Sequence, residues 1–401
     1  MFIMKYDFNK TVAREDFCSV KYDNRGIVFG RHDVIPLWIA DMDFTVAEPI
    51  VRACERRTKH GIFGYTSRPD DYYRAAASFM ERRHGWNVPI ETLSFCPGIV
   101  PALYSLIQIM SKPGDKILLQ TPVYNCFHDV IKASEDRILL SNKLVKTEKG
   151  EFPYEIDFKD FEEKLSLEKP ALFLLCNPHN PVGRVWTPDE LFKMHRLCLE
   201  YNVPVISDEI HGDLELFGHK YTPSHTLGKE ISKNTVVCFS ASKTFNLAGL
   251  QASNLSFGNT KWKSSFDSYW SALHLDLNNC YSVEAFKAAW LYGDEWLDEL
   301  LKYLEGNMIF IRDYAGKYIP ELSVYLPEAS YLMWLDFSSL NMTQDELCVF
   351  LVEEAGVGLS DGRSFDPDAI GFMRMNVASP RSVIERAMYQ IREAVAKRRA
   401  C

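Results

Sequence analysis

The sequence predicts an α/β fold in which a mainly parallel mixed sheet forms a larger domain and is followed by a smaller α+β domain. Three observations lead to this prediction. The 401 residues exceed the length of one ordinary core. Through the middle of the chain, short apolar runs alternate with helical patterns. After about residue 285, long helical patterns surround only a few short strands.

The strands of the larger domain are predicted from six short runs rich in β-branched or large aliphatic residues, at 116–120, 137–140, 171–176, 203–207, 235–239 and 252–257. Continuous apolar runs of this length suit strands that are buried on both faces, as in a parallel sheet. A helix is predicted over 188–201, with Thr187 as its N-cap and Glu190 completing a capping box. Later helices are predicted over 283–291, 296–318, 344–354 and 381–398.

Composition and charge exclude several classes of function. The net charge of −9 disfavours nucleic acid and anionic membranes as partners. Apolar runs are strand-length, and the first ten residues lack a secretory pattern. The ten cysteines stand singly without a Cys-x-x-Cys pair, which argues against a disulfide framework or a zinc site. We therefore expect a cytoplasmic protein with no metal, no nucleic-acid partner and no membrane partner.

A lysine follows the predicted strand 235–239, in the stretch Ser240-Ala-Ser-Lys243. Open α/β sheets bind ligands at the carboxyl ends of their strands. A lysine there can form an imine with an aldehyde, and nearby serines can hold an anion. An ordinary surface lysine is the alternative. Ser-x-x-Lys is also the nucleophile motif of penicillin-binding enzymes, but its Ser-Asp-Asn and Lys-Thr-Gly partners are absent from this chain.

Two more strand ends carry polar side chains. Asp208 follows 203–207 and could keep a ring nitrogen protonated, although a loop or capping aspartate is the alternative. Asn180 lies in a proline-rich turn after 171–176, where it offers an amide or serves a purely structural turn. His211 by itself is typical of a satisfied polar residue, since no second histidine stands at metal-ligand spacing.

The combination of these features indicates a cofactor. A helix is predicted to begin at Gly98-Ile-Val-Pro101, and the free N–H groups of a helix start can hold a phosphate. An imine-forming amine, an acid, an amide and a phosphate site together match the needs of a phosphorylated pyridine aldehyde. We therefore predict that the chain binds pyridoxal 5'-phosphate.

The residues resemble the fold-type I pyridoxal-phosphate enzymes of the aspartate aminotransferase superfamily, and most closely its MalY/PatB branch of cystathionine β-lyases and cystalysin-like C–S lyases. The matching stretches run in order through nearly the whole chain: 38–44, 63–65, 98–103, 121–124, the Asn180 turn, 207–211, 240–246, 331–337 and 374–378. The resemblance implies a fold-type I transferase fold, with a large domain over 49–284 and a small domain formed by 1–48 and 285–401.

The resemblance also implies a role for each candidate residue. Lys243 would carry the cofactor as a Schiff base and move protons, Asp208 would pair with the ring nitrogen, and Tyr124 would stack on the ring. Asn180 would contact the ring hydroxyl and lie close to the substrate. The phosphate would be held by Ile99, Val100, Ser240 and Ser242. His211 lies among the cofactor-binding residues, with its own role left open.

Further implications concern the substrate and the assembly. Arg374 would bind the substrate α-carboxylate, helped by backbone near Ala40. Tyr65 would reach the phosphate of a neighbouring subunit, which implies a homodimer with shared active sites. Two departures separate the chain from aspartate aminotransferase. His211 replaces a tyrosine, and Leu250-Gln251 stands where a phosphate-binding arginine is usual.

The resemblance favours a carbon–sulfur β-lyase. Such an enzyme would convert a sulfur-containing L-amino acid, cystathionine or cysteine, to pyruvate, ammonia and a thiol or sulfide. An aminotransferase is the first alternative, because both reactions begin with loss of the Cα proton. A MalY-like regulatory protein that binds a transcription factor is an alternative of another class.

Overall fold

The computed structural model describes residues 5–147, 154–275 and 277–399 and divides into two compact units. The large unit comprises Val46–Asn180 and Arg184–Leu297, and the small unit comprises Met1–Thr45, Pro181–Gly183 and Asp298–Cys401. The predicted domain bounds, 49–284 for the large domain and 1–48 with 285–401 for the small domain, stay a prediction. Among the described helices, none is both long and apolar enough to cross a membrane.

A seven-stranded sheet forms the centre of the large unit, with the spatial order β2-β10-β9-β8-β7-β3-β4. Its strands are β2 (Leu93–Cys96), β3 (Lys116–Thr121), β4 (Ile138–Lys143), β7 (Leu172–Cys176), β8 (Val205–Asp208), β9 (Thr235–Phe239) and β10 (Ser253–Phe257). β10 runs antiparallel to both of its neighbours, and every other pairing is parallel. Six strands therefore end at the same edge, as a mainly parallel mixed sheet requires.

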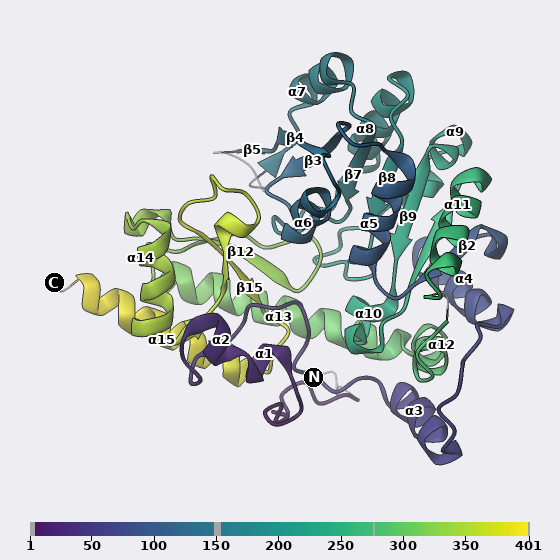
Figure 1. The fold of residues 1–401 in the computed structure, drawn as a ribbon. Coiled ribbons are helices and arrows are strands. Elements are labelled where there is room, and N and C mark those ends of the chain that lie inside the picture. Colours follow the sequence, from purple (N-terminus) through teal and green to yellow (C-terminus); the bar gives the residue numbers. More distant parts are fainter. Residues whose placement is uncertain (1–4, 148–153, 276, 400–401) are drawn as a thin grey trace. The chain divides into compact units, whose positions relative to one another are not determined.

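Helices connect and cover these strands (Figure 1). The α-helices of the large unit are α3 (Glu48–His60), α4 (Asp70–His84), α5 (Ile99–Met110), α6 (Asn125–Ala133), α7 (Phe158–Glu163), α8 (Pro188–Glu200), α9 (Lys229–Lys233), α10 (Ala241–Thr244), α11 (Thr260–Ala272) and α12 (Ser282–Tyr292). Short 3₁₀ turns lie at Ile90–Thr92, Ser224–Thr226 and Ala248–Leu250, a π turn at Lys164–Glu168, and a two-stranded ribbon at β5 (Val145–Lys146) and β6 (Tyr154–Glu155).

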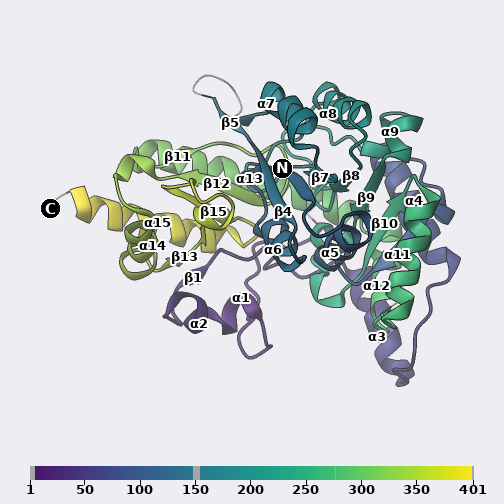
Figure 2. The ribbon, with the colours of Figure 1, turned by 45° about the horizontal axis from the view of Figure 1, so that its top comes forward.

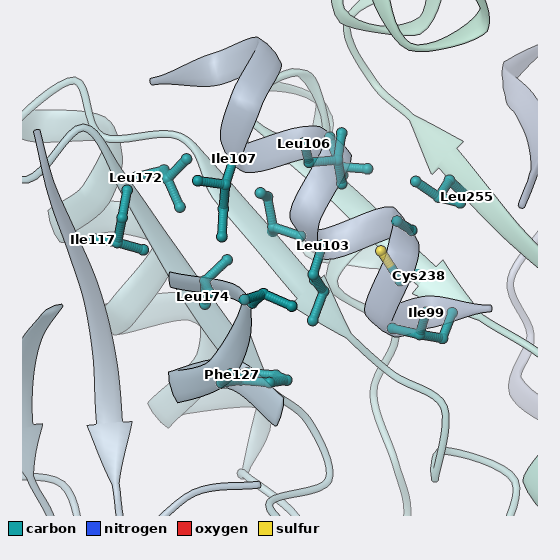
Figure 3. Packing of buried hydrophobic residues seen from close by; sticks show 14 of the residues in the cluster. Ile99, Leu103, Leu106, Ile107, Ile117, Phe127, Leu172, Leu174, Cys238 and Leu255 are labelled. Atoms are coloured by element: carbon teal, nitrogen blue, oxygen red, sulfur yellow. The ribbon is translucent and has the colours of Figure 1, made fainter. Parts of the chain in front are cut away.

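One apolar cluster fixes helices α5, α6 and α11 against the same face of the sheet (Figure 2). Leu103, Leu106 and Ile107 project from α5 toward the strands, where they meet Leu174 and Cys238 (Figure 3). All five side chains are at most 1% exposed, so helix α5 is held firmly at the sheet.

The small unit is built on a four-stranded sheet of order β11-β12-β15-β14. Its strands are β11 (Ser323–Val324), β12 (Leu332–Asp336), β14 (Ser360–Asp361) and β15 (Phe372–Asn376), and β1 (Ile35–Pro36) pairs separately with β13 (Val357–Gly358). Its helices are α1 (Val20–Asp23), α2 (Arg25–Phe29), α14 (Gln344–Val349) with a π turn at Phe350–Glu354, and α15 (Arg381–Arg399). Short 3₁₀ turns lie at Ser338–Leu340 and Gly362–Ser364. α13 (Asp294–Tyr318) begins in the large unit and continues through the small one.

The fold-class prediction is confirmed, and the six predicted strands all occur with ends shifted by up to three residues. The capping box of Thr187 and Glu190 is present at the start of α8. Strand β2 was missed, because its four residues Leu-Ser-Phe-Cys are too few to show a pattern. The predicted helix 344–354 is a helix of six residues that continues as a π turn.

Candidate active site

Four neighbouring strands each deliver one candidate side chain to the same edge of the large sheet. Lys243 follows β9, Asp208 ends β8, Asn180 follows β7 and Tyr124 follows β3. These strands are consecutive in the sheet and parallel. Cys176, Asp208 and Cys238 are paired in register, so β7, β8 and β9 end level with one another. The predicted convergence of the strand ends is therefore present in the fold.

Lys243 lies in α10, a single turn directly after β9. Ser240 caps this turn by accepting a hydrogen bond from the Ser242 N–H at 3.0 Å. Its hydroxyl also donates to the Ala252 carbonyl at 2.7 Å, which ties the turn to the start of β10. Ser240 and Ser242 are buried. The position of Lys243 is thus fixed by capping and by the sheet.

Asp208 is a buried carboxylate at the end of β8, and its Oδ1 accepts a hydrogen bond from the Ile210 N–H at 3.1 Å. Burial raises the pKa of Asp208 to about 7, although the Ile210 bond and the charge of Lys243 act to lower it. Within the part of the chain that the structure describes, this carboxylate forms no ion pair. A protonated ring nitrogen would supply the positive partner that Asp208 lacks, so the site suits a pyridinium group.

Two turns at this edge are joined to each other. Asn180 is buried in the turn after β7, where the His179 N–H donates to the Arg184 carbonyl at 2.7 Å. A hydrogen bond of 2.8 Å also links His179 Nε2 to the Pro122 carbonyl. Pro122 lies two residues before Tyr124, the half-buried N-cap residue of α6. The amide and the aromatic ring that were predicted to contact a cofactor are therefore held by one connected pair of turns.

The predicted phosphate cradle begins at the end of β2. Gly98 is the N-cap of α5, and Ile99 and Val100 are its first residues. β2 runs in the same direction as β9, because both are antiparallel to β10. The start of α5 therefore lies at the edge where Lys243 is found. Free N–H groups at such a start attract anions.

Sequence reasoning missed a charged network beside Lys243. The Thr244 hydroxyl donates to Asp213 Oδ2 at 2.6 Å, and His84 Nε2 bonds Asp213 Oδ1 at 2.7 Å. Burial acts to lower the pKa of His84, but hydrogen bonds to Asp213 and Glu215 outweigh it and raise the pKa to about 9. His84 is distant in sequence from the motifs, so no local pattern indicated it.

Two other candidates in the large unit lie in contrasting surroundings. His211 is buried in the loop after β8, and its carbonyl accepts the Leu214 N–H at 3.0 Å. Tyr65 is 96% exposed and lines a surface hollow of about 680 Å³ together with Phe63 and Tyr281. An aromatic side chain this exposed is accessible to another molecule.

Two candidates for substrate binding, Arg374 and Ala40, belong to the small unit. Arg374 lies in β15, where its Nη2 donates to the Trp38 carbonyl at 3.1 Å and its guanidinium lies 4.7 Å from the ring centre of Phe365. The Ala40 carbonyl accepts the Tyr331 hydroxyl at 3.1 Å. A buried arginine held in this way can present its planar fork to a carboxylate. The roles of all these residues stay predictions.

The chain is similar to known proteins over nearly its whole length. The chain is 39% identical over 389 residues to the cystathionine beta-lyase PatB of Bacillus subtilis, covering 97% of this chain and all of the relative. It is 32% identical to the protein MalY of Escherichia coli, covering 97% and 99% of the two chains. A solved PLP-bound C–S lyase from Staphylococcus hominis is 31% identical, with a TM-score of 0.89 over 98% of this chain and 99% of that one. The family model of aminotransferase class I and II matches residues 32–391, and the chain belongs to that family.

Proposed function

We propose that this protein is a pyridoxal-phosphate-dependent carbon–sulfur β-lyase. It would convert L-cystathionine or L-cysteine to pyruvate, ammonia and a thiol or sulfide. The observation that carries the proposal is the convergence of an amine, a carboxylate, an amide and an aromatic ring at one sheet edge. The near full-length similarity to a cystathionine beta-lyase and to a PLP-bound C–S lyase supports the same reaction.

The described residues suit the cofactor. The charge of Lys243 does not offset the burial of Asp208, Asn180 offers an amide at the adjacent strand end, and the start of α5 offers N–H groups for the phosphate. When bound, pyridoxal phosphate supplies an aldehyde that attaches to amines and a protonated ring that draws electrons from the substrate Cα. Ile99, Val100, Ser240 and Ser242 would hold the phosphate, and Asn180 would donate to the ring oxygen.

Each of these side chains would then have a defined role. Lys243 Nζ would anchor the cofactor and take the proton from the substrate Cα. Asp208 would keep the ring nitrogen protonated through its negative charge. Tyr124 would cover one ring face. Arg374 would bind the α-carboxylate and orient the Cα–H bond, after which the thiolate leaves from Cβ. We assign no step to His211.

The anchoring lysine can be tested by reduction of the purified holoenzyme with borohydride, followed by peptide mapping. The label should lie on Lys243, and Lys243→Ala should abolish thiol release. Lys220→Ala, at a lysine whose side chain is 79% exposed, is the matched control and should remain active. A label on any other lysine would overturn the assignment.

The lyase reaction can be separated from transamination by a product assay. Cystathionine or cysteine should give pyruvate, ammonia and a thiol or sulfide without an added keto acid, because elimination releases the nitrogen. Alanine with a keto-acid acceptor should turn over far more slowly. Rapid amino transfer without thiol release would favour an aminotransferase. The regulatory alternative is not favoured by any specific contact.

We also propose a homodimer in which Tyr65 completes the phosphate site of the partner subunit. The 96% exposure of Tyr65 supports this idea. Hybrid dimers of a Tyr65→Ala subunit and a Lys243→Ala subunit provide the test. If Tyr65 serves the partner, one site in each hybrid is intact and activity returns. If Tyr65 acts within its own subunit, both sites are damaged and the hybrids stay inactive.

The site of action is proposed to be the cytoplasm. The nine described cysteines are all free, which agrees with a reducing compartment. Fractionation of cells that produce the protein, with activity measured in each fraction, tests this proposal. Activity confined to a membrane or extracellular fraction would contradict it.

A further inference from the structure

The segment Trp38–Asp43 of the small unit is held by hydrogen bonds to its backbone carbonyl groups. The carbonyl groups of residues 37–42 all accept hydrogen bonds. The Trp38 carbonyl accepts from Arg374 at 3.1 Å and from the Ser360 hydroxyl at 2.9 Å. The other donors include the Asn376 N–H to Leu37 at 2.8 Å, the Asn376 amide to Ile39 at 2.7 Å and to Asp41 at 2.6 Å, the Tyr331 hydroxyl to Ala40 at 3.1 Å, and Arg14 to Met42 at 3.2 Å. Four of these bonds come from Arg374 and Asn376 of strand β15, so the segment is fixed along this strand.

A buried group of charges lies at one end of this segment. Asp43 is 5% exposed and Lys21 is fully buried, with 2.9 Å between Lys21 Nζ and Asp43 Oδ2. Arg14 Nη1 lies 2.7 Å from Asp43 Oδ1, and its Nη2 lies 2.7 Å from Asp41 Oδ2. The carboxylate of Asp43 therefore joins helix α1 and the residues before it to the segment.

Asp43 is also bonded to the residues that directly follow β15. The Ser379 hydroxyl donates to Asp43 Oδ2, and the Asp43 N–H donates to the Ala378 carbonyl at 2.8 Å. Arg374 lies on this strand and donates back to Trp38, five residues before Asp43. The segment and β15 thus form a closed loop of contacts, with the charged group at one end and Arg374 at the other.

We propose that Asp43 is a positioning residue for the substrate-carboxylate site, acting through the Trp38–Asp43 segment on the guanidinium of Arg374. Its counterions are Lys21 and Arg14. The inference rests on the proposed role of Arg374 and adds a residue that does not touch the substrate. Buried ion pairs contribute little net stability compared with apolar residues of similar volume. Buried ion pairs do, however, hold their groups in a fixed geometry. Such a geometry would keep the guanidinium of Arg374 within a fraction of an ångström of the position in which it binds a carboxylate.

The test compares two ligands that differ only in the carboxylate. L-Alanine and ethylamine both carry an amine, and each is titrated into the holoenzyme while cofactor absorbance is followed. The wild-type protein should bind L-alanine more tightly. In Asp43→Asn this preference should fall about tenfold, as expected when one charge-assisted hydrogen bond is weakened. Ethylamine affinity and cofactor affinity should stay unchanged.

A second readout does not involve the loaded enzyme. In the cofactor-free protein, hydrogen exchange at residues 38–43 should be faster in Asp43→Asn than in wild type, while exchange in β8 and β9 is unaltered. Ser379→Ala removes one bond to Asp43 and keeps both ion pairs. It should show a smaller loss of carboxylate preference, and it serves as the test if Asp43→Asn does not fold.

The outcomes separate this inference from the proposed function. A wild-type preference for L-alanine that survives in Asp43→Asn, or in Ser379→Ala where the first variant does not fold, would overturn the positioning role and leave Arg374 untouched. If the wild-type protein does not prefer L-alanine over ethylamine, the carboxylate site itself is wrong, and both statements fall together. Loss of the preference with intact cofactor binding supports the inference.

Discussion

Asp208 in the large unit and Asp43 in the small unit are buried to almost the same degree, at 6% and 5% exposure, yet their surroundings act in opposite directions. Burial raises the pKa of Asp208 to about 7. Burial acts to raise the pKa of Asp43 too, but the Lys21 ammonium, helped by hydrogen bonds from Lys21, Ser379 and Arg14, outweighs it and lowers the pKa below its ordinary value.

The difference teaches that the supply of a cation, and not burial, decides what a buried carboxylate does. The chain itself provides cations for Asp43, so the charge of this carboxylate is balanced without a ligand. For Asp208 the neighbouring charge of Lys243 does not offset burial. A buried acid with this deficit is suited to a ligand that brings a positive charge, as a protonated pyridine nitrogen does.

Of the substitutions at these two acids, Asp208→Asn should have the larger effect on activity. The amide keeps the size of the side chain but cannot hold a proton on the ring nitrogen by charge. Turnover of cystathionine should fall about 10²- to 10³-fold, the usual loss when one electrostatic partner of the reacting group is removed. Steady-state kinetics with circular dichroism as the folding control would check this. A near-normal rate would show that Asp208 is not the ring partner.

The sequence predicts the position of Asp208 but not the surroundings of Asp43. Asp208 follows an apolar run directly, so its place at a strand end was predictable. So were the positions of Lys243 and Asn180, because each follows a run of the same kind. The order of the strands in the sheet was not predictable, since pairing between distant segments depends on packing.

The surroundings of Asp43 were beyond sequence reasoning. Lys21 and Ser379 are separated from Asp43 by 22 and 336 residues. The motif 38–44 was noticed only through its resemblance to a family, and no pattern in it identified the buried cation. The network of His84, Asp213 and Thr244 was not predicted, for the same reason. Long-range polar contacts leave no periodic signal in a single sequence.

Lys21→Met should produce the largest loss of stability. The change leaves Asp43 buried with Arg14 as its remaining cation. Breaking a buried pair by removing one partner costs about 3–5 kcal/mol, and the presence of Arg14 places the expected loss at about 3 kcal/mol. Urea denaturation of the cofactor-free protein measures it. The double variant Lys21→Met with Asp43→Asn should recover part of the loss, because no uncompensated charge remains. If the losses simply add, the two groups are not coupled.

The pH dependence of the free energy of unfolding should also distinguish the two acids, because their pKa values are shifted in opposite directions. The pKa of Asp208 is 3.8 in the unfolded chain and is raised to about 7 in the folded chain. Between these values the folded chain holds a proton that the unfolded chain has lost, so raising the pH favours unfolding. The cofactor-free protein should therefore lose stability over this range through Asp208.

Denaturation of wild type and Asp208→Asn at several pH values measures this contribution. The variant should show a flatter profile, with a residual slope from Glu209, whose pKa burial also raises. Asp43 should contribute on the acid side instead. Its stabilisation is present above about 3.8 and is lost as the pH falls through its lowered pKa. Identical profiles for wild type and Asp208→Asn would contradict the raised pKa.

The smallest effect is expected for Asp33→Asn, which removes an acid with a cation but without burial. Arg31 Nη2 lies 2.7 Å from Asp33 Oδ2, yet the Asp33 side chain is 70% exposed. The hydrogen bond from Arg31 lowers the pKa of Asp33, but water screens the pair. Arg31 would remain in place, because its Nη1 also donates to the carbonyls of Val352 and Glu353. Neither the melting temperature nor the ratio of L-alanine to ethylamine affinity should change measurably.

The variant belongs to the same unit as Asp43→Asn and loses the same charge, so it shows whether charge removal alone alters the carboxylate site. A loss of carboxylate preference in Asp33→Asn equal to that in Asp43→Asn would mean that the site responds to the net charge of the small unit, and the distinction between buried and exposed acids would not hold.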